Sequence, residues 1–303
     1  MVTANNLVKT YGKKNEILAV DHVSFSVEEG EIFGLIGPDG AGKTSIFRML
    51  TTLLLPDSGS AAIQGLDVVK DYEKTRNIVG YMPGKFSLYP DLSVEENLNF
   101  FATVFGTTIQ ENYGLIKEIY IQLEPFKKRR AGKLSGGMKQ KLALCCALIH
   151  KPAVLFLDEP TTGVDPVSRK EFWEMLKRLK EQNITILVST PYMDEATRCD
   201  RIALMHSGRI LSIDTPASIS ASYPDKLLAV KANKMSALLK ALSKFEKALN
   251  SYVFGQYAHV AISSKELTME NDLKAFLQKE GIENIEIDPI EASVEDCFIK
   301  LLK

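Results

Sequence analysis

Apolar and polar positions divide the first 215 residues into short strands and helices that alternate along the chain. Residues 31–36 and 154–159 contain continuous apolar runs, typical of parallel strands buried on both faces, whereas residues 20–27 alternate as a half-buried strand does. Residues 44–50 and 170–181 predict helices. Strands that alternate with helices indicate an α/β fold built on a parallel sheet.

A helical segment interrupts this alternation. Residues 78–82 predict a strand, and from about residue 93 to residue 150 the pattern indicates helices only. Ser93 and Glu96 have the spacing of a capping box, in which two side chains bond each other's backbone N–H groups at a helix start. We therefore expect a first domain over residues 1–220 that carries a helical subdomain over about 86–150.

The pattern changes again near Ser220, where Ser220–Asp225 predicts a linker. Beyond it, over 225–303, we expect a small α+β accessory domain of the ferredoxin-like, split βαβ type. Its expected elements are a strand (226–231), a helix (235–245), a strand pair (252–263), a helix (271–279), a strand (282–287) and a last helix from about Ser293.

Composition narrows the class of protein. The 303 residues suffice for roughly two domains, and 45% hydrophobic with 25% charged residues is ordinary for a globular protein. A net charge of −1 provides no strongly basic field, so no nucleic-acid partner is expected. No apolar run reaches the about 18 residues of a membrane-spanning helix, and no signal peptide is apparent. The four cysteines form no C-x-x-C motif, which favours reduced thiols in a cytoplasmic protein.

Residues 37–44 fit G-x-x-x-x-G-K-[ST], the pattern of a phosphate-binding loop. The loop joins the expected strand at 31–36 to the expected helix at 44–50, so phosphates would meet free N–H groups at a helix start. Lys43 would reach the β- and γ-phosphates, and Thr44 would ligate Mg²⁺. The residues expected to contact the nucleotide here are Gly37, Pro38, Asp39, Gly40, Ala41, Gly42, Lys43, Thr44 and Ser45.

Two acids follow the apolar run that begins at Val154. Asp158 would hold Mg²⁺, and Glu159 would polarise the attacking water, which makes Glu159 and Lys43 the expected catalytic residues. A merely solvated strand end is the alternative, and the phosphate loop weighs against it. Tyr11, upstream, could stack on a purine ring, although an edge tyrosine is the alternative there.

Residues 134–140, Leu-Ser-Gly-Gly-Met-Lys-Gln, resemble the signature sequence of ATP-binding cassette (ABC) proteins. Residues 163–166 resemble the D-loop of that family, and residues 191–196 resemble the segment with its switch residue. Tyr11 resembles its adenine-stacking aromatic. The likeness covers roughly residues 5–215 and is greatest to ATPase subunits of multidrug exporters, whose carboxy-terminal extension often carries the S-x-E-D-x-F pattern found at 293–298.

The resemblance implies a P-loop NTPase fold, ATP and Mg²⁺ as cofactors, and a head-to-tail dimer of cassettes. In such a dimer Ser135, Gly136, Gly137 and Asp165 would contact the nucleotide of the second cassette chain, in a homo- or heterodimer. Permease subunits would be separate membrane-spanning chains that dock near 86–97. The chain would lie in the cytoplasm, peripheral to the inner face of the cell membrane.

Three positions depart from the family pattern. Asp39 stands where the family usually has Asn, Gly84 where it has a Gln that contacts Mg²⁺ and water, and Pro191 where it has a His that bonds the γ-phosphate. We therefore expect tight Mg·ATP binding with slow hydrolysis, unless Lys85 or Thr190 compensates. The alternative function is a regulatory ATP-binding clamp with little turnover, in transport or outside it.

Overall fold

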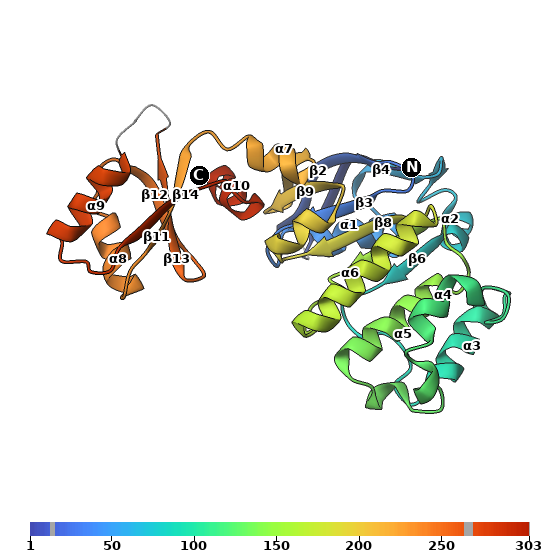
Figure 1. Ribbon diagram of the computed structural model, residues 1–303. Helices are drawn as coiled ribbons and strands as arrows, with labels where there is room; N and C mark the ends of the chain where they lie inside the picture. The colour runs from blue at the N-terminus through green and yellow to red at the C-terminus, as the bar shows by residue number, and fades with distance from the viewer. Residues whose placement is uncertain (13–15, 264–268, 303) are drawn as a thin grey trace. The chain divides into compact units, whose positions relative to one another are not determined.

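The computed structural model describes residues 1–12, 16–263 and 269–302. They form two compact units, one over residues 1–216 and one over residues 217–303 (Figure 1). The division falls at the start of helix α7 (Pro216–Ala221), slightly before the linker predicted at 220–225. Among the described residues, no helix combines the length and the apolar character needed to cross a membrane.

A six-stranded sheet with the order β10-β9-β3-β8-β7-β6 forms the centre of the first unit. All neighbouring strands pair in parallel except β9 and β10. Every residue of β3, β7 and β8 is buried, as their continuous apolar runs predict. The strands are β3 (Ile32–Ile36), β6 (Val79–Met82), β7 (Val154–Asp158), β8 (Thr185–Thr190), β9 (Arg201–His206) and β10 (Arg209–Asp214).

A second sheet, antiparallel and with the order β2-β1-β4-β5, shares a hydrophobic core with the first. Its strands are β1 (Val2–Tyr11), β2 (Ile17–Val27), β4 (Ser58–Ile63) and β5 (Leu66–Asp67). Helix α1 (Lys43–Leu50) contributes Phe47 to this core, where its ring meets Phe156 of β7 edge-on at 5.5 Å. This contact packs the helix after the phosphate loop against the strand that ends at Asp158. Further helices of the unit are α2 (Tyr72–Ile78), α6 (Pro166–Glu181) and the 3₁₀ helix η3 (Met193–Arg198).

Only helices lie between β6 and β7 among the described residues (Figure 1). They are α3 (Val94–Val104), α4 (Tyr113–Tyr120), the 3₁₀ helices η1 (Glu124–Phe126) and η2 (Ala131–Lys133), and α5 (Gly136–Leu148). Ser93 and Glu96 form the expected capping box at the start of α3. Lys141 of α5 binds Glu171 of α6 at 2.8 Å, so an ion pair connects the subdomain to the α/β layer.

The second unit has a split βαβ arrangement of strands and helices. Its sheet order is β12-β13-β11-β14 with all pairs antiparallel, and its helices α8 and α9 each follow a strand in the order βαββαβ. The elements are β11 (Lys226–Lys231), α8 (Met235–Leu242), β12 (Ala248–Phe254), β13 (Tyr257–Ile262), α9 (Met269–Lys279), β14 (Glu286–Ile290) and α10 (Val294–Leu301).

The last strand of this unit was predicted too early. We expected it at 282–287, but β14 begins at Glu286. Asn284 has a φ of 53°, in the left-handed region, so an extended strand does not run through it. Ile282 and Ile285 still pack against the core of the unit, from the loop before the strand. Their apolar side chains therefore indicated burial correctly and secondary structure wrongly.

Helix α10 is fixed to the sheet through Asp296. Ser293 and Asp296 form a capping box, and Asp296 also accepts a hydrogen bond from the Tyr252 hydroxyl at 2.5 Å and lies 2.7 Å from His259 Nδ1. Burial raises the pKa of Asp296, but hydrogen bonds from His259, Ser293 and Tyr252 outweigh it and the net pKa is lowered. The carboxylate therefore stabilises the second unit in its ionised form.

We expect Asp296→Asn to destabilise the second unit by about 1–3 kcal/mol at neutral pH, because a buried charged acceptor is lost. In the native chain this stabilisation is fully present above the unfolded pKa of about 3.9 and is lost as pH falls through the lower folded value. Urea unfolding by circular dichroism between pH 3 and 7 measures it. The single tryptophan, Trp173 in α6, reports on the first unit by fluorescence, and serves as the internal control. Equal pH dependence in both proteins would show that Asp296 is not the linked group.

Candidate functional site

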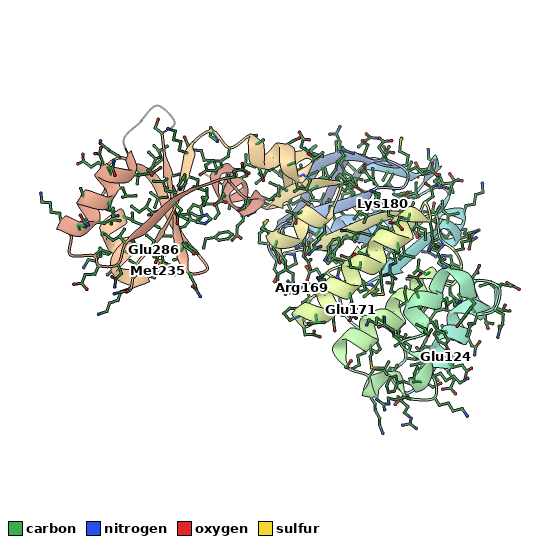
Figure 2. All side chains as sticks on the ribbon, viewed as in Figure 1. Glu124, Arg169, Glu171, Lys180, Met235 and Glu286 are labelled. Atoms are coloured by element: carbon green, nitrogen blue, oxygen red, sulfur yellow. The ribbon has the colours of Figure 1, made fainter. Side chains whose placement is uncertain are left out.

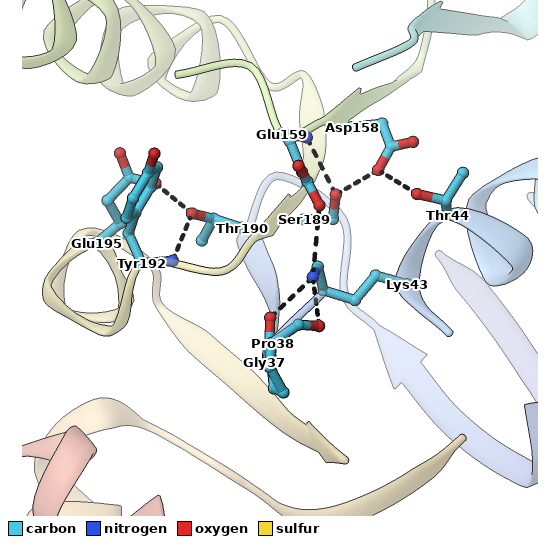
Figure 3. Close-up of polar contacts among 10 residues, drawn as sticks. All are labelled: Gly37, Pro38, Lys43, Thr44, Asp158, Glu159, Ser189, Thr190, Tyr192 and Glu195. Carbon is cyan, nitrogen blue, oxygen red and sulfur yellow. Dashed lines mark hydrogen bonds and ion pairs between the residues drawn. The ribbon is translucent and has the colours of Figure 1, made fainter. Parts of the chain in front are cut away.

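Three strands of the parallel sheet end at the same edge and bring the predicted site residues together. β8 lies between β3 and β7, with Ile36 opposite Thr190 and Asp158 opposite Ser189. The segments that follow these strands are the phosphate loop, residues 191–195 and Glu159. Figure 3 shows Lys43, Thr44, Asp158 and Glu159 close together, with Tyr192 and Glu195 to one side, next to Thr190. Carboxyl ends of parallel strands are where open α/β sheets bind ligands.

The backbone of the loop forms a cradle that only glycine permits at two positions. A Cβ at Gly37 would lie 2.3 Å from the carbonyl oxygen of Met205. Gly42 has a φ of 102°, and a Cβ there would lie 2.3 Å from the carbonyl oxygen of Ala19. The N–H groups of Gly40, Gly42, Lys43 and Thr44 have no hydrogen-bond acceptor among the described residues. Free N–H groups at a helix start fit a phosphate group.

The Lys43 ammonium group lies under this cradle with 3% of its side chain exposed. It donates to the carbonyl oxygens of Gly37 at 2.7 Å and Pro38 at 3.0 Å. Its nitrogen also lies 3.5 Å from Glu159 Oε1. Lys43 and Glu159, the two residues predicted to be catalytic, therefore form an ion pair (Figure 3).

A pair of oxygen ligands suited to Mg²⁺ lies beside the lysine. Thr44 Oγ1 donates to Asp158 Oδ1 at 3.1 Å, and Ser189 Oγ donates to the same oxygen at 2.5 Å. Asp158 is 3% exposed. Mg²⁺ usually takes one or two protein oxygens and completes its shell with water and phosphate oxygens, so Thr44 and Asp158 fit this ion. Bound there, the ion would supply positive charge to the phosphates.

Glu159 is held in an unusual backbone conformation at the end of β7. Its φ is 49°, which non-glycine residues rarely adopt. Its N–H group donates to the carbonyl oxygen of Ser189 at 3.0 Å and to Ser189 Oγ at 3.1 Å. Ser189 therefore fixes both acids. It donates its hydroxyl to the Asp158 carboxylate and accepts a hydrogen bond from the backbone N–H of Glu159. Sequence reasoning missed this serine, although its place at the end of the neighbouring strand is a signal for it.

The segment after β8 is organised around a buried glutamate that the sequence did not single out. Glu195, 2% exposed, accepts hydrogen bonds from Thr161 Oγ1 at 2.7 Å and from Thr190 Oγ1 at 2.6 Å. Arg169 of α6 lies 3.6 Å from Glu195 Oε1 and over the ring of Tyr192 at 4.2 Å. The only hydroxyl hydrogen of Thr190 points to Glu195, so Thr190 has none for a phosphate. Thr190 therefore does not replace the missing histidine in this geometry.

The three departures from the family pattern all lie at or beside this edge. Asp39 is exposed at the tip of the loop. Pro191 follows the last residue of β8 and has no N–H group to donate. A Cβ at Gly84 would lie 3.0 Å from the carbonyl oxygen of Asp158, so any side chain at residue 84 requires the backbone to shift by a few tenths of an ångström. Neither Gly84 nor Pro191 offers a polar side chain to the site.

Tyr11 lies next to the helix that follows the phosphate loop. Its hydroxyl is 3.0 Å from Ser45 Oγ, and its ring is partly buried. The contact joins the end of β1 to the second residue after Lys43. The role of Tyr11 in stacking on a base stays a prediction.

Ser135 and Gly136 of the signature lie at the protein surface. Ser135 is the N-cap of α5 and accepts from the N–H of Met138 at 3.4 Å. Ser135 and Gly136 are exposed, and among the described residues no hydrogen bond or ion pair connects them to the loop. Gly137 packs against the start of α6, where Asp165 accepts hydrogen bonds from Val167 and Ser168 that lower its pKa.

Comparisons with known proteins agree with this geometry. Residues 20–162 match the family described as ABC transporter. The chain is 43% identical over 224 residues to the probable multidrug ABC transporter ATP-binding protein YbhF of Escherichia coli, which covers 73% of this chain and 38% of YbhF. The chain thus spans well under half the length of that relative. It is 36% identical over 300 residues to the Nod factor export ATP-binding protein I of Burkholderia lata, covering 98% of this chain and 95% of that protein.

Solved structures show the same cassette fold. The ATP-binding subunit of an ABC transporter superimposes with a TM-score of 0.66 at 27% identity, over 74% of this chain and 93% of that one. A dimeric post-hydrolysis state of the cassette MJ0796, bound to ADP and Pi, gives a TM-score of 0.64 at 26% identity, over 71% and 98%. The chain therefore belongs to the ABC transporter family of ATP-binding cassette ATPases.

Proposed function

We propose that this chain is the ATP-binding and ATP-hydrolysing subunit that energises a membrane transporter, of the export type, and that its own ATP site turns over slowly. The observation that carries the proposal is the convergence of Lys43, Thr44, Asp158 and Glu159 around free loop N–H groups, with no polar side chain at Gly84 or Pro191. The groups that bind Mg·ATP are all present there, and the two side chains that would act in the transition state, at residues 84 and 191, are missing. Both named relatives are described as transporter or export proteins.

In this proposal ATP lies along the loop with its base against Tyr11 and its phosphates on the N–H groups at the start of α1. Lys43 leaves the carbonyl oxygens of Gly37 and Pro38 and binds the phosphates. Thr44 and Asp158 hold Mg²⁺, and Glu159, released from Lys43, orients the attacking water and accepts its proton. Phosphoryl transfer depends on such positioning and charge.

A second cassette completes each ATP site. The exposed Ser135 and Gly136 offer a hydroxyl and N–H groups at the start of α5, and a γ-phosphate held by another chain fits them. Asp165 at the start of α6 faces the same surface region, because Gly136 and Gly163 approach each other. The solved dimer of MJ0796 shows that cassettes of this fold associate. ATP-driven closure of two cassettes is the proposed source of mechanical work.

The proposed docking site for a permease subunit is a pocket of about 490 Å³ between the helical subdomain and the α/β layer. Its lining is largely apolar and includes Tyr81, Leu88, Phe101, Val104 and Phe105. Phe86 and Tyr89, in the segment predicted to dock, are exposed nearby in sequence. An apolar hollow on an exposed surface suits a short helix of a membrane protein, and such docking would place this chain at the inner face of the cell membrane.

Slow hydrolysis follows from the missing donors. A hydrogen bond to a charged group contributes about 1.5–3 kcal/mol, so one that acts in the transition state contributes about ten- to a hundredfold in rate. Pro191 stands at the position where the family has a histidine, and the hydroxyl of Thr190 is bonded to Glu195. The same geometry favours, as second candidate, a regulatory ATP-binding clamp whose closure matters and whose turnover does not.

We expect Lys43→Ala to weaken Mg·ATP binding about ten- to a hundredfold, because its charge–phosphate contact is lost. Glu159→Gln should bind at least as tightly as the native chain, because the carboxylate that competes for Lys43 is gone. Isothermal titration with excess Mg²⁺ measures both. Equal loss in the two variants would contradict the proposed division between a binding residue and a hydrolytic one.

We expect Pro191→His to raise steady-state ATP hydrolysis about ten- to a hundredfold, through a donor to the γ-phosphate. The matched control is Pro191→Ala, which removes the ring and adds no donor, and should stay as slow as the native chain. A phosphate-release assay measures all three. If Pro191→Ala rises as much as Pro191→His, the backbone restraint and not the missing donor limits the rate.

We expect Val104→Lys to release the chain from membranes of cells that contain its transporter, because a charge enters the apolar pocket. Ile121→Lys is the control, since both residues are exposed, at 62% and 54%, and lie at helix ends, but only Val104 lines the pocket. The membrane-bound fraction after sedimentation is the measurement, with ATP affinity unchanged in both. Retention of Val104→Lys on membranes would place the docking site elsewhere.

A further inference from the structure

One edge of the sheet in the second unit carries neither charge nor proline, and its one irregularity among the described residues is a register shift against β13 between Ala248 and Asn250. The strand order ends at β12, which pairs only with β13 among the described residues. Its seven residues, Ala-Leu-Asn-Ser-Tyr-Val-Phe, include no charge and no proline. An edge strand presents a row of free N–H and C=O groups, which is a template for another strand.

The opposite edge of the same sheet is protected. β14 has Glu286, Asp288 and Pro289 among its five residues. Charged side chains and proline are the usual means of preventing strand addition. Glu286 is visible on that strand in Figure 2. The contrast between the two edges indicates that β12 is open to a partner and β14 is closed.

The exposed side chains of β12 are complementary to their own copy. Leu249 and Val253 are 53% and 50% exposed, and they lie symmetrically about Ser251 in the sequence. In an antiparallel pair centred on Ser251, Leu249 of one copy lies opposite Val253 of the other, and the twofold axis repeats this contact. The contact of Leu249 with Val253 therefore occurs twice, once on each side of the axis, as in an isologous interface.

We propose that β12 pairs antiparallel with β12 of a second copy of this chain, which joins the two four-stranded sheets into one. A second copy fits better than a foreign strand because β12 carries no charge with which to select one, and a neutral strand does not repel itself. The pairing needs no nucleotide, so it is separate from ATP-driven closure. It holds two copies of the chain together in every nucleotide state and raises the effective concentration of their cassettes.

Sedimentation velocity of the full chain without nucleotide, over a concentration series, tests the pairing. The native chain should form a concentration-dependent dimer. Leu249→Lys with Val253→Lys should raise the dimer dissociation constant at least about tenfold, because like charges would face each other across the axis. Asp288→Lys changes the net charge by the same amount at the protected edge and should leave the constant unchanged.

A mixture of two variants with opposite charges on β12 distinguishes loss of pairing from misfolding. A chain with Leu249→Glu and Val253→Glu should stay monomeric alone and should form a heterodimer with the lysine chain. The register is tested by Ser251→Cys, which should cross-link under mild oxidation more completely than Val253→Cys, since the four native cysteines are buried. Both chains should bind ATP like the native protein, which distinguishes failure here from failure of the proposed function.

A native chain that stays monomeric without nucleotide at every concentration overturns the proposal. So does a dimer that persists in the lysine variant, which would place the contact on another surface. If β12 instead pairs with a strand of a different protein, the purified chain stays monomeric, which is the first of these results. If Asp288→Lys weakens the dimer as much as the two lysines on β12 do, the effect comes from net charge and not from the β12 edge. That result also overturns the proposal.

Discussion

The parallel pairing of β3, β8 and β7 is the constraint on which the nucleotide site depends. Because β8 lies between the other two, Ser189 at its end reaches both Asp158 and the N–H group of Glu159, while the phosphate loop leaves β3 beside Thr190. The contact of Phe47 with Phe156 packs α1 on β7. A slip of one residue in either register would separate Thr44 from Asp158, since side chains alternate between faces of a sheet.

Much of this arrangement could be predicted from the sequence. The glycine pattern at 37–44 and the acids after an apolar strand indicate their chemistry directly, because few other residues meet those steric and ionic demands. The capping box at Ser93 and the helix start at Ser293 are local signals and were confirmed. The roles of Ser189 and Glu195 could not be predicted, because they depend on which strands become neighbours. Asn284 shows a further limit, since one left-handed residue displaced β14.

In the proposed function, the departures at Gly84 and Pro191 leave ATP binding intact and lower the rate of hydrolysis. Loop N–H groups, Lys43 and the Thr44–Asp158 pair act on bound phosphate in the ground state and the transition state alike. Donors at residues 84 and 191 would act chiefly as charge moves to the γ-phosphate, and binding lost only in the transition state lowers turnover alone. The bond from Thr190 to Glu195 matters because it removes the nearest substitute donor.

The central claim is therefore a complete binding site with an incomplete hydrolytic one. Its most direct test is the turnover per bound ATP of the purified native chain at saturating Mg·ATP, measured beside Glu159→Gln as the blank. The account predicts stoichiometric binding with turnover within a few-fold of the blank. Turnover about a hundredfold or more above the blank would contradict it, because the site would then work without donors at Gly84 and Pro191.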